Sequence, residues 1–292
     1  MWTLSTGDSP YIKLTDYAVC DGVTDDTANW NAFLAAVKAS DYRVGILPAK
    51  QIRFASQPDP IDTCVNLWGA GQIGAGLPST VLIRDYAGTT NTGLIEIVAG
   101  AHGTTLDGFI IEATDNYTGG CGISLIASGT AAMNRVQFQN ICITAYGNNI
   151  YQHALYVDGT ALTTGAIGIR GLSLFNCDLF GANGYSAVFK GVEALDWHGG
   201  GVYPAAGTAT DSGAIQITGT SAVPSNYIRM SLTNFNGLDL SYCQYGSIDA
   251  ALISNSYRTH SISNTSTCQD FRVRAKVTGS VQSNWVNSSQ VW

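Results

Sequence analysis

The chain has 292 residues, of which 33 are glycine; 45 % are hydrophobic and only 12 % are charged. Its net charge of −7 and its pI of about 4.9 argue against nucleic acid and against an anionic membrane surface as partners. No run of 18 apolar residues exists, so we expect no membrane insertion.

The first informative segment, residues 15–37, combines a turn with an amphipathic helix. Residues 20–22 read Cys-Asp-Gly and predict the turn. A helix over residues 25–39 follows, with either Thr24 or Asp25 as the expected N-cap. Four apolar residues at helical spacing predict its buried face: Trp30, Phe33, Leu34 and Val37.

This segment resembles the N-terminal signature of the pectate-lyase superfamily of right-handed parallel β-helices, D-[FY]-G-A-x-G-D-G-x-T-D-D-T followed by a capping helix. The matching residues are Asp16, Tyr17, Ala18, Asp21, Gly22, Thr24, Asp25, Asp26 and Thr27. Residues 45–49, 65–71 and 81–83 resemble the first strands after that helix. The resemblance implies a fold but no single function, because the superfamily includes pectate lyases, polygalacturonases and bacteriophage tail spikes.

An internal repeat follows. Four segments align without gaps and a fifth fits more weakly: residues 106–112, 138–144, 174–180, 235–241 and, as the weaker copy, 197–203. Positions 1, 4 and 6 are mostly apolar and should face inward. Position 3 is mostly Gly or Asn, which tolerate left-handed backbone, and Asn there suits an internal amide ladder at a corner. We expect one stacked core that includes Ile141, Ile143, Leu179, Val202, Leu238 and Leu240.

A second strand follows each copy, at residues 123–125, 155–157, 187–189, 215–217 and 252–254. Three of these strands end at similar turns: Asp158-Gly159, Lys190-Gly191 and Thr218-Gly219. Period-two alternation within a longer repeat predicts an all-β, right-handed, single-stranded parallel β-helix, closed at one end by an α-helix. We expect a cap at residues 1–44, the β-helix at 45–278 and a tail at 279–292.

The C-terminal region offers two further features. Residues 271–277 alternate strictly, so Arg272, Arg274 and Lys276 should share one face, either solvated or in contact with an acidic glycan or a partner subunit. The tail from residue 279 contains Trp285 and Trp292 but no charge, and such an apolar end needs a cover.

The sequence gives no metal or cofactor signature. Seven scattered cysteines include no C-x-x-C pair and are expected as free thiols, mostly buried. The N-terminus lacks a basic region followed by an apolar one, which argues against Sec export.

The motifs of the best-known enzymes of the superfamily are missing. Polygalacturonases carry N-T-D, D-D, G-H-G and R-I-K, whereas the only D-D here is the capping pair Asp25-Asp26; the arginine pair of pectate lyases is also absent. His198 precedes three glycines and invites a role as a base, but no serine nucleophile signature accompanies it, and a turn or surface position is the favoured interpretation.

The outward face of the aligned strand remains as a site. Position 5 holds Asp178 and Asp239, two coils apart with Gly201 between them. This spacing corresponds to about 9–10 Å, and inverting glycosidases separate their carboxyl groups by about 6.5–9.5 Å. We therefore take this pair as the candidate catalytic acids, and Glu112 as the second choice.

Aromatic residues supply candidate sugar platforms. Phe180 and Tyr203 stand one column away from the acid pair, and Tyr156 lies on a second strand. Outward acids and aromatic stacks can also stabilise a β-helix without binding anything.

The resemblance implies a phage tail-spike or tail-fibre protein, a homotrimer that binds a bacterial surface polysaccharide and could also depolymerise it, located in the virion. Two alternatives remain: a non-catalytic structural or adhesion β-helix, and an extracellular polysaccharide lyase or hydrolase secreted by a cell.

Overall fold

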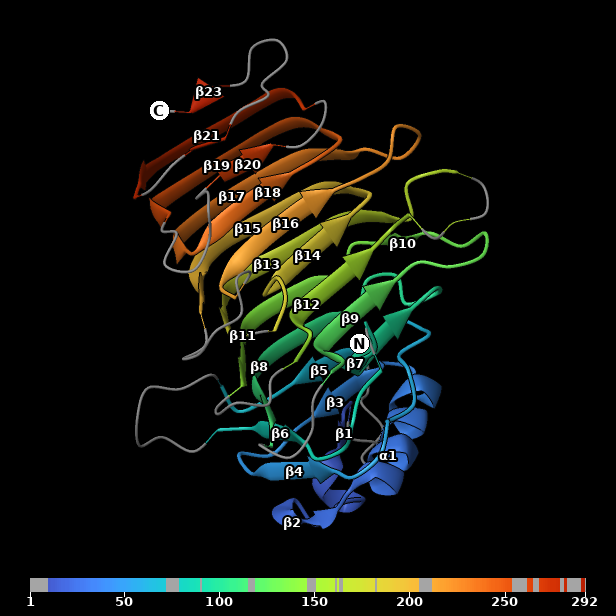
Figure 1. Cartoon of the computed structure of the whole chain (residues 1–292). Helices are drawn as coiled ribbons and strands as arrows, with labels where there is room; N and C mark the ends of the chain where they lie inside the picture. Colours follow the sequence, from blue (N-terminus) through green and yellow to red (C-terminus); the bar gives the residue numbers. More distant parts are fainter. Residues whose placement is uncertain are drawn as a thin grey trace, which may run out of the picture.

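The computed structural model shows a stack of coils that rises from the N-terminal to the C-terminal end of the chain (Figure 1). It describes residues 10–71, 79–89, 91–114, 119–145, 151–160, 162, 165–181, 183–204, 212–253, 262–264, 268–278, 281–282 and 290–291. Every strand pair in it is parallel, and the chain moves repeatedly from one sheet to the other. The predicted right-handed parallel β-helix is confirmed.

The longer sheet, sheet A, has 15 strands. They are β1 (Ile12–Lys13), β2 (Asp21–Asp25), β3 (Val44–Ile46), β4 (Gln51–Phe54), β5 (Asn66–Trp68), β6 (Val81–Arg84), β8 (Thr105–Ala113), β10 (Met133–Asn134), β11 (Gln137–Ala145), β13 (Ile169–Phe180), β15 (Val192–Tyr203), β17 (Ser225–Phe235), β19 (Cys243–Ile253), β21 (Gln269–Val277) and β23 (Gln290–Val291). Strand β1 already pairs with β3, so sheet A begins on the N-terminal side of residue 45.

The second sheet, sheet B, has eight strands. They are β7 (Gly93–Val98), β9 (Cys121–Ile126), β12 (His153–Asp158), β14 (Ala187–Lys190), β16 (Ala214–Thr218), β18 (Gly237–Leu240), β20 (Ile262–Asn264) and β22 (Val281–Gln282). The three predicted glycine turns stack at the end of sheet B, where the amide of Gly159 donates to the Lys190 carbonyl and that of Gly191 donates to the Thr218 carbonyl.

One continuous core fills the coils. The six residues predicted for it are all buried: Ile141, Ile143, Leu179, Val202, Leu238 and Leu240. Trp197, fully buried, packs edge-on against Phe189 of sheet B and donates its indole N–H to the Gly199 carbonyl at 3.1 Å. No coil could bury its apolar face alone, so stability depends on the stack.

Single left-handed residues bend the long strands of sheet A twice. The first bend falls at corresponding positions of successive coils: Gly103, Arg135, Gly171, Ala194, Tyr227, Tyr245 and Asp270, all with positive φ. The second bend holds the position-3 residues of the repeat, Gly108, Asn140, Asn176 and Gly199. The predicted preference for Gly or Asn at this corner is therefore confirmed.

The amide ladder at the second bend lies on the outside of the solenoid, not inside as predicted. Asn176 donates to the side chain of Asn140 at 3.0 Å, and Asn140 donates to Asp107 at 2.9 Å. The bend turns these side chains outward, because the flanking apolar residues take the inward positions.

The cap is the helix α1 (Thr27–Ala39), preceded by a 3₁₀ turn at Leu14–Asp16. Its predicted apolar face is buried, and the ring of Trp30 packs edge-on against Phe54 of β4. Lys38 ties the helix to the next loop through the Pro60 carbonyl at 2.8 Å and an ion pair with Asp62 at 2.7 Å.

The predicted N-cap was wrong by at least one residue. Asp26 occupies the N-cap position, but its side chain makes no capping hydrogen bond to the helix. Its carboxylate, fully buried, accepts instead from the amides of Val19 and Cys20, both at 3.1 Å. Asp25 bonds the helix start, because its Oδ1 accepts from the Thr27 amide at 3.0 Å.

One copy of the repeat was aligned wrongly. Residues 235–241 do not extend the column of residues 174–180 and 197–203, since β18 pairs with β16 in sheet B. The next member of that column in sheet A starts at Met230, which pairs with Trp197. Correspondingly, the fifth second strand is β18, whereas residues 252–253 belong to β19 of sheet A.

The seven cysteines are all free thiols, five of them buried and two half-buried. Within the part of the chain that the structure describes, no helix is long and apolar enough to cross a membrane.

Candidate functional site

The predicted acid pair is separated by the fold. Asp178 lies in β13 of sheet A, where it pairs with Cys142 and Gly201 and accepts from the Gly201 amide at 3.0 Å. Asp239 lies in β18 of sheet B, pairs with Gln216 and accepts from the hydroxyl of Tyr185. Because the two carboxylates stand on different sheets, they do not lie two coils apart in one column, and the alignment that paired them is wrong.

The other predicted residues on sheet A do share a strip. Glu112 pairs with Thr144 in the next coil, and the same column continues through Phe180 and Tyr203. The rings of Phe180 and Tyr203 stack with centroids 4.5 Å apart and planes 12° apart. Each ring therefore covers one face of the other.

Glu112 is the predicted acid whose protonation the structure alters. Burial raises the pKa of its carboxyl group above the ordinary value. A carboxyl group of this kind holds its proton to higher pH, which is the property of a general acid. Glu112 remains a candidate acid on this strip.

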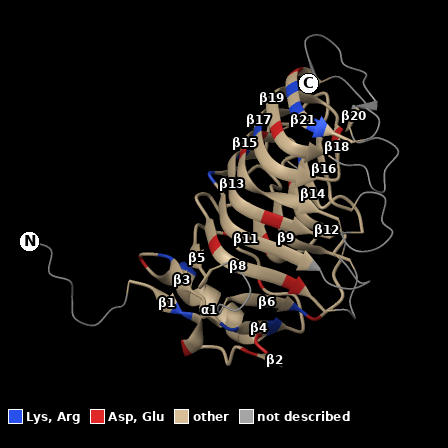
Figure 2. Ribbon diagram, turned by 90° about the vertical axis from the view of Figure 1, so that its left-hand side faces the viewer, with Lys and Arg blue, Asp and Glu red and all other residues tan. Residues whose placement is uncertain are grey.

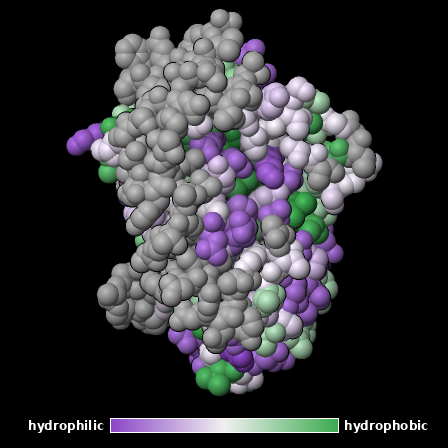
Figure 3. Space-filling model, in the orientation of Figure 1, coloured by the Kyte–Doolittle hydropathy of each residue, from purple (hydrophilic) through white to green (hydrophobic). Residues whose placement is uncertain are grey.

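Tyr156 does not offer an open ring. It lies in sheet B, is only 4 % exposed, and stacks on His153 with centroids 5.5 Å apart. Its hydroxyl donates to Asp158 at 2.9 Å and accepts from Lys190 at 3.0 Å. Hydrophilic side chains gather over the middle of the face that carries sheet B (Figure 3). Tyr156 is thus a structural residue, which corrects its prediction as a glycan platform.

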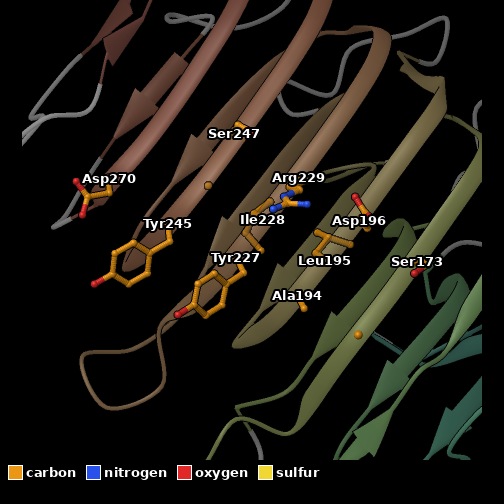
Figure 4. A pocket seen from close by; sticks show the side chains of 12 residues that line it. Ser173, Ala194, Leu195, Asp196, Tyr227, Ile228, Arg229, Tyr245, Ser247 and Asp270 are labelled. Carbon is orange, nitrogen blue, oxygen red and sulfur yellow. The ribbon is translucent and has the colours of Figure 1, made fainter.

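A separate hollow lies on the outer face of sheet A beside its first bend (Figure 4). It is an open groove of about 710 Å³, which we call the corner groove. Its lining comes from four successive strands, β13, β15, β17 and β19, and from the first residues of β21. The residues used below are Gly171, Ser173, Ala194, Asp196, Tyr227, Arg229, Tyr245, Ser247 and Asp270.

Two parallel columns of side chains form the groove. The column at the bend runs through Gly171, Ala194, Tyr227, Tyr245 and Asp270. The second column, two residues further along each strand, runs through Ser173, Asp196, Arg229 and Ser247. Figure 4 shows the two columns as neighbouring rows, with inward-facing Leu195 and Ile228 between them.

Tyr227 and Tyr245 are the exposed aromatic residues of the groove. They are 55 % and 47 % exposed, and their rings stack with centroids 5.5 Å apart and planes 18° apart. Tyr245 covers one face of Tyr227, and Ala194 occupies the equivalent bend on the other side. Exposed rings beside a groove can stack on a ligand.

The second column supplies donors and acceptors. Asp196 contacts the Nε2 of His198 at 2.8 Å, and the His198 ring lies against Phe175 with centroids 6.0 Å apart. Arg229 follows Asp196 in the next coil and is exposed. Acid, guanidinium and hydroxyl groups thus stand in successive coils, about 4.8 Å apart.

The groove continues along the bend column toward the N-terminal end of the solenoid. There it meets a hollow of about 620 Å³ at Arg135 and Arg170, and Arg170 pairs with Glu193 at 3.0 Å. A separate hollow of about 390 Å³ lies further along β17, β19 and β21, near the C-terminal end, and is lined by Asp249, Arg274 and Lys276. Basic side chains gather on β21 at that end (Figure 2), where Arg272, Arg274 and Lys276 are exposed as predicted.

The sequence contains a pattern that corresponds to this groove. The five quartets after the first bend alternate apolar and outward residues, at 172–175, 195–198, 228–231, 246–249 and 271–274. Aligning residues 235–241 with the repeat hid the third quartet, and with it Tyr227 and Arg229.

The described residues show no cluster of three or more His, Cys, Asp or Glu side chains suited to a metal ion. With an aromatic wall and a row of polar groups, the corner groove can hold an elongated polar ligand that also has apolar faces. That combination is typical of a carbohydrate chain.

Comparisons with known proteins give the same fold. No family model and no curated protein sequence matches the chain. Among solved structures, ORF18 of Geobacillus virus E2 matches with a TM-score of 0.55 and 12 % identity, over 96 % of this chain and 60 % of that one. This chain therefore spans less than two thirds of that protein.

Two further matches are the A-modules of the mannuronan C-5 epimerases AlgE4 and AlgE6 of Azotobacter vinelandii. Their TM-scores are both 0.33 and their identities 16 % and 12 %; the matches cover 97 % and 96 % of this chain, and 100 % and 97 % of those modules. The strand pairing and the viral match together establish the fold: the chain is a right-handed parallel β-helix.

Proposed function

We propose that this protein binds a bacterial surface polysaccharide through the corner groove, as part of a phage virion. The observation that carries the proposal is the exposed stack of Tyr227 and Tyr245 beside the polar column of Asp196 and Arg229. Aromatic rings bind the C–H faces of sugars, while carboxylate, guanidinium and hydroxyl groups bind their hydroxyls.

The shape of the groove gives the direction of the glycan. Two of the hollows follow one another along the bend column on the outer face of sheet A, from Arg135 to Tyr227. A linear polysaccharide would therefore run along the solenoid axis and contact one coil about every 4.8 Å. Successive coils would contact successive sugars of the polysaccharide.

The virion location takes its support from the printed name of a structural neighbour, ORF18 of Geobacillus virus E2. A homotrimeric assembly, as the resemblance to tail spikes implies, is part of the same proposal. Light scattering after gel filtration tests it: a mass of about three chains of 30.8 kDa supports the trimer, and a monomer contradicts it.

The binding test uses an array of purified bacterial capsular polysaccharides and lipopolysaccharide O-chains. The wild type should bind at least one of them, and the double variant Tyr227→Ala/Tyr245→Ala should lose about tenfold or more in affinity. Tyr42→Ala is the matched control, because Tyr42 is 59 % exposed and follows α1. Equal binding by the double variant and the wild type would contradict the groove.

Depolymerisation is a second candidate function, favoured by one observation, the raised pKa of Glu112 on the strip with Phe180 and Tyr203. Glu112→Gln keeps the shape of the side chain but cannot transfer a proton, a loss of about 10²–10⁴-fold in rate. Reducing ends and unsaturated-uronate absorbance are both followed on the bound polysaccharide. Cleavage by the wild type but not by Glu112→Gln supports catalysis. If the wild type binds the polysaccharide and does not cleave it, the protein is a non-catalytic adhesin.

A further inference from the structure

The corner groove changes its lining on one side of Tyr227. The bend column holds two large rings, Tyr227 and Tyr245, and then two small residues, Ala194 and Gly171, before Arg135 follows. Tyr245 stacks on Tyr227 from one side, and Ala194 lies on the other side (Figure 4). Tyr227 is therefore the aromatic wall at one end of a slot over Ala194 and Gly171.

We infer that this slot is a subsite for one pyranose ring of the polysaccharide, stacked on the free face of Tyr227. The inference rests on the proposed function and adds the chemistry and the position of one bound sugar. Its walls and floor are side chains that the structure describes.

The dimensions of the slot suit such a ring. Two coil steps separate the level of Tyr227 from that of Gly171, about 9–10 Å. A ring in van der Waals contact with Tyr227 lies about 3.5–4 Å from it. One pyranose therefore fits over Ala194 and Gly171.

The polar groups lie where the edge of that ring would be. Asp196 stands on the level of Ala194, Ser173 on the level of Gly171, and Arg229 on the level of Tyr227. A ring standing on Tyr227 would point its equatorial hydroxyls at this column. Asp196 accepts from hydroxyls, Arg229 donates to them, and Ser173 can do both. The subsite therefore selects a sugar with hydroxyl groups on the edge that faces the second column.

The residues of the bend column indicate which substitutions fill the slot without disturbing the fold. Tyr227 and Tyr245 are themselves left-handed, with φ of 55° and 52°, and Ala194 has φ of 60°. Ala194→Tyr would thus place at this bend a residue that the next two coils already accept there, and its ring would continue the stack. Gly171→Asn fills the slot from the other end, and Asn is among the residues that tolerate left-handed backbone best.

The test measures affinity for the polysaccharide that the wild type binds on the array, with Ala194→Tyr, Gly171→Asn, Tyr227→Ala and the control Tyr42→Ala. We expect both filling variants to melt near the wild-type temperature and to lose about tenfold or more in affinity, as Tyr227→Ala does.

The outcomes separate the inference from the proposed function. Wild-type affinity in a folded Ala194→Tyr or Gly171→Asn variant, together with weak binding by Tyr227→Ala, would overturn the subsite and leave the groove. Wild-type affinity in Tyr227→Ala would overturn the subsite as well. If the wild type binds no polysaccharide on the array, the proposed function and the subsite both fail.

Discussion

Tyr227 and Tyr245 occupy equivalent bends of successive coils and stack with ring centroids 5.5 Å apart, yet about half of each side chain is exposed. The stack of Phe180 and Tyr203 is tighter, at 4.5 Å, and both of its members are half-buried. The two aromatic stacks of sheet A thus differ in how far their rings are exposed. The first lies in a groove with its rings about half exposed, and the second is half-buried on the strip.

The Phe180–Tyr203 stack should contribute to stability. A double-mutant cycle with Phe180→Ala and Tyr203→Ala is expected to give a coupling energy of about 0.5–1.5 kcal/mol in urea unfolding. A coupling energy near zero would show that the two rings do not interact. Polysaccharide affinity measured on the same variants tests whether the strip also binds a glycan, as the sequence predicted.

The outer amide ladder depends on left-handed backbone. Asn176 has φ of 52°, and glycine stands at the equivalent bend in Gly108 and Gly199. Asn176→Gly loses the hydrogen bond to Asn140 but keeps a residue suited to the bend, whereas Asn176→Ala loses both. We expect Asn176→Ala to be less stable than Asn176→Gly by about 1 kcal/mol in urea unfolding. The reverse order would contradict the role of the bend.

The core should respond strongly to truncation. Leu179 is 1 % exposed and lies in the column between Ile143 and Val202. Leu179→Ala should lower the free energy of unfolding by about 2–5 kcal/mol, because it removes buried methyl groups and leaves a cavity. Ser231→Ala, at an exposed position of β17, is the control and should change it by less than about 0.5 kcal/mol. Equal effects of the two changes would be incompatible with the described core.

The acidic N-terminal turn should make stability depend on pH. The hydrogen bond from the Thr27 hydroxyl, followed by that from the Ala55 amide, lowers the pKa of Asp25 below its ordinary value. The amide of Thr24, followed by that of Val23, lowers the pKa of Asp21. Because the folded pKa values lie below the unfolded value of about 3.9, this stabilisation is complete above about pH 4 and is lost as the pH falls through the folded values.

Urea midpoints at pH 6 and pH 3 measure that dependence. The wild type should lose stability between the two values, and Asp21→Asn/Asp25→Asn should lose less. An identical loss in the double variant would assign the acid sensitivity to other carboxyl groups.

Much of the fold could be predicted because a β-helix repeats its local chemistry. Glycine or asparagine at position 3 of the repeat predicted a left-handed bend at one register, and these residues are Gly108, Asn140, Asn176 and Gly199. Alternating apolar residues predicted the stacked core. The turns at the end of sheet B were equally clear, since a glycine follows each strand at the same place.

The wrong alignment of residues 235–241 and the wrong acid pair have one physical origin. Alternation of apolar and polar residues marks a strand but not the sheet to which it belongs, so residues 235–241 imitated a strand of sheet A. In the structure Asn236, fully buried, donates to the Ser212 carbonyl at 2.8 Å and turns the chain into sheet B. No local sequence pattern predicts that long-range contact. Because the contact was not predicted, Asp239 was assigned to the column of Asp178. Tyr227 could be recognised as a groove residue only from the pairing of the strands.

Hydroxyl-radical footprinting of the tyrosines tests the central claim most directly. The wild-type protein is oxidised with and without a saturating amount of the polysaccharide that it binds on the array. Our account predicts that the glycan protects Tyr227 and Tyr245 while the oxidation of Tyr42 stays unchanged. Unchanged oxidation of Tyr227 and Tyr245 in the saturated complex would contradict binding in the corner groove.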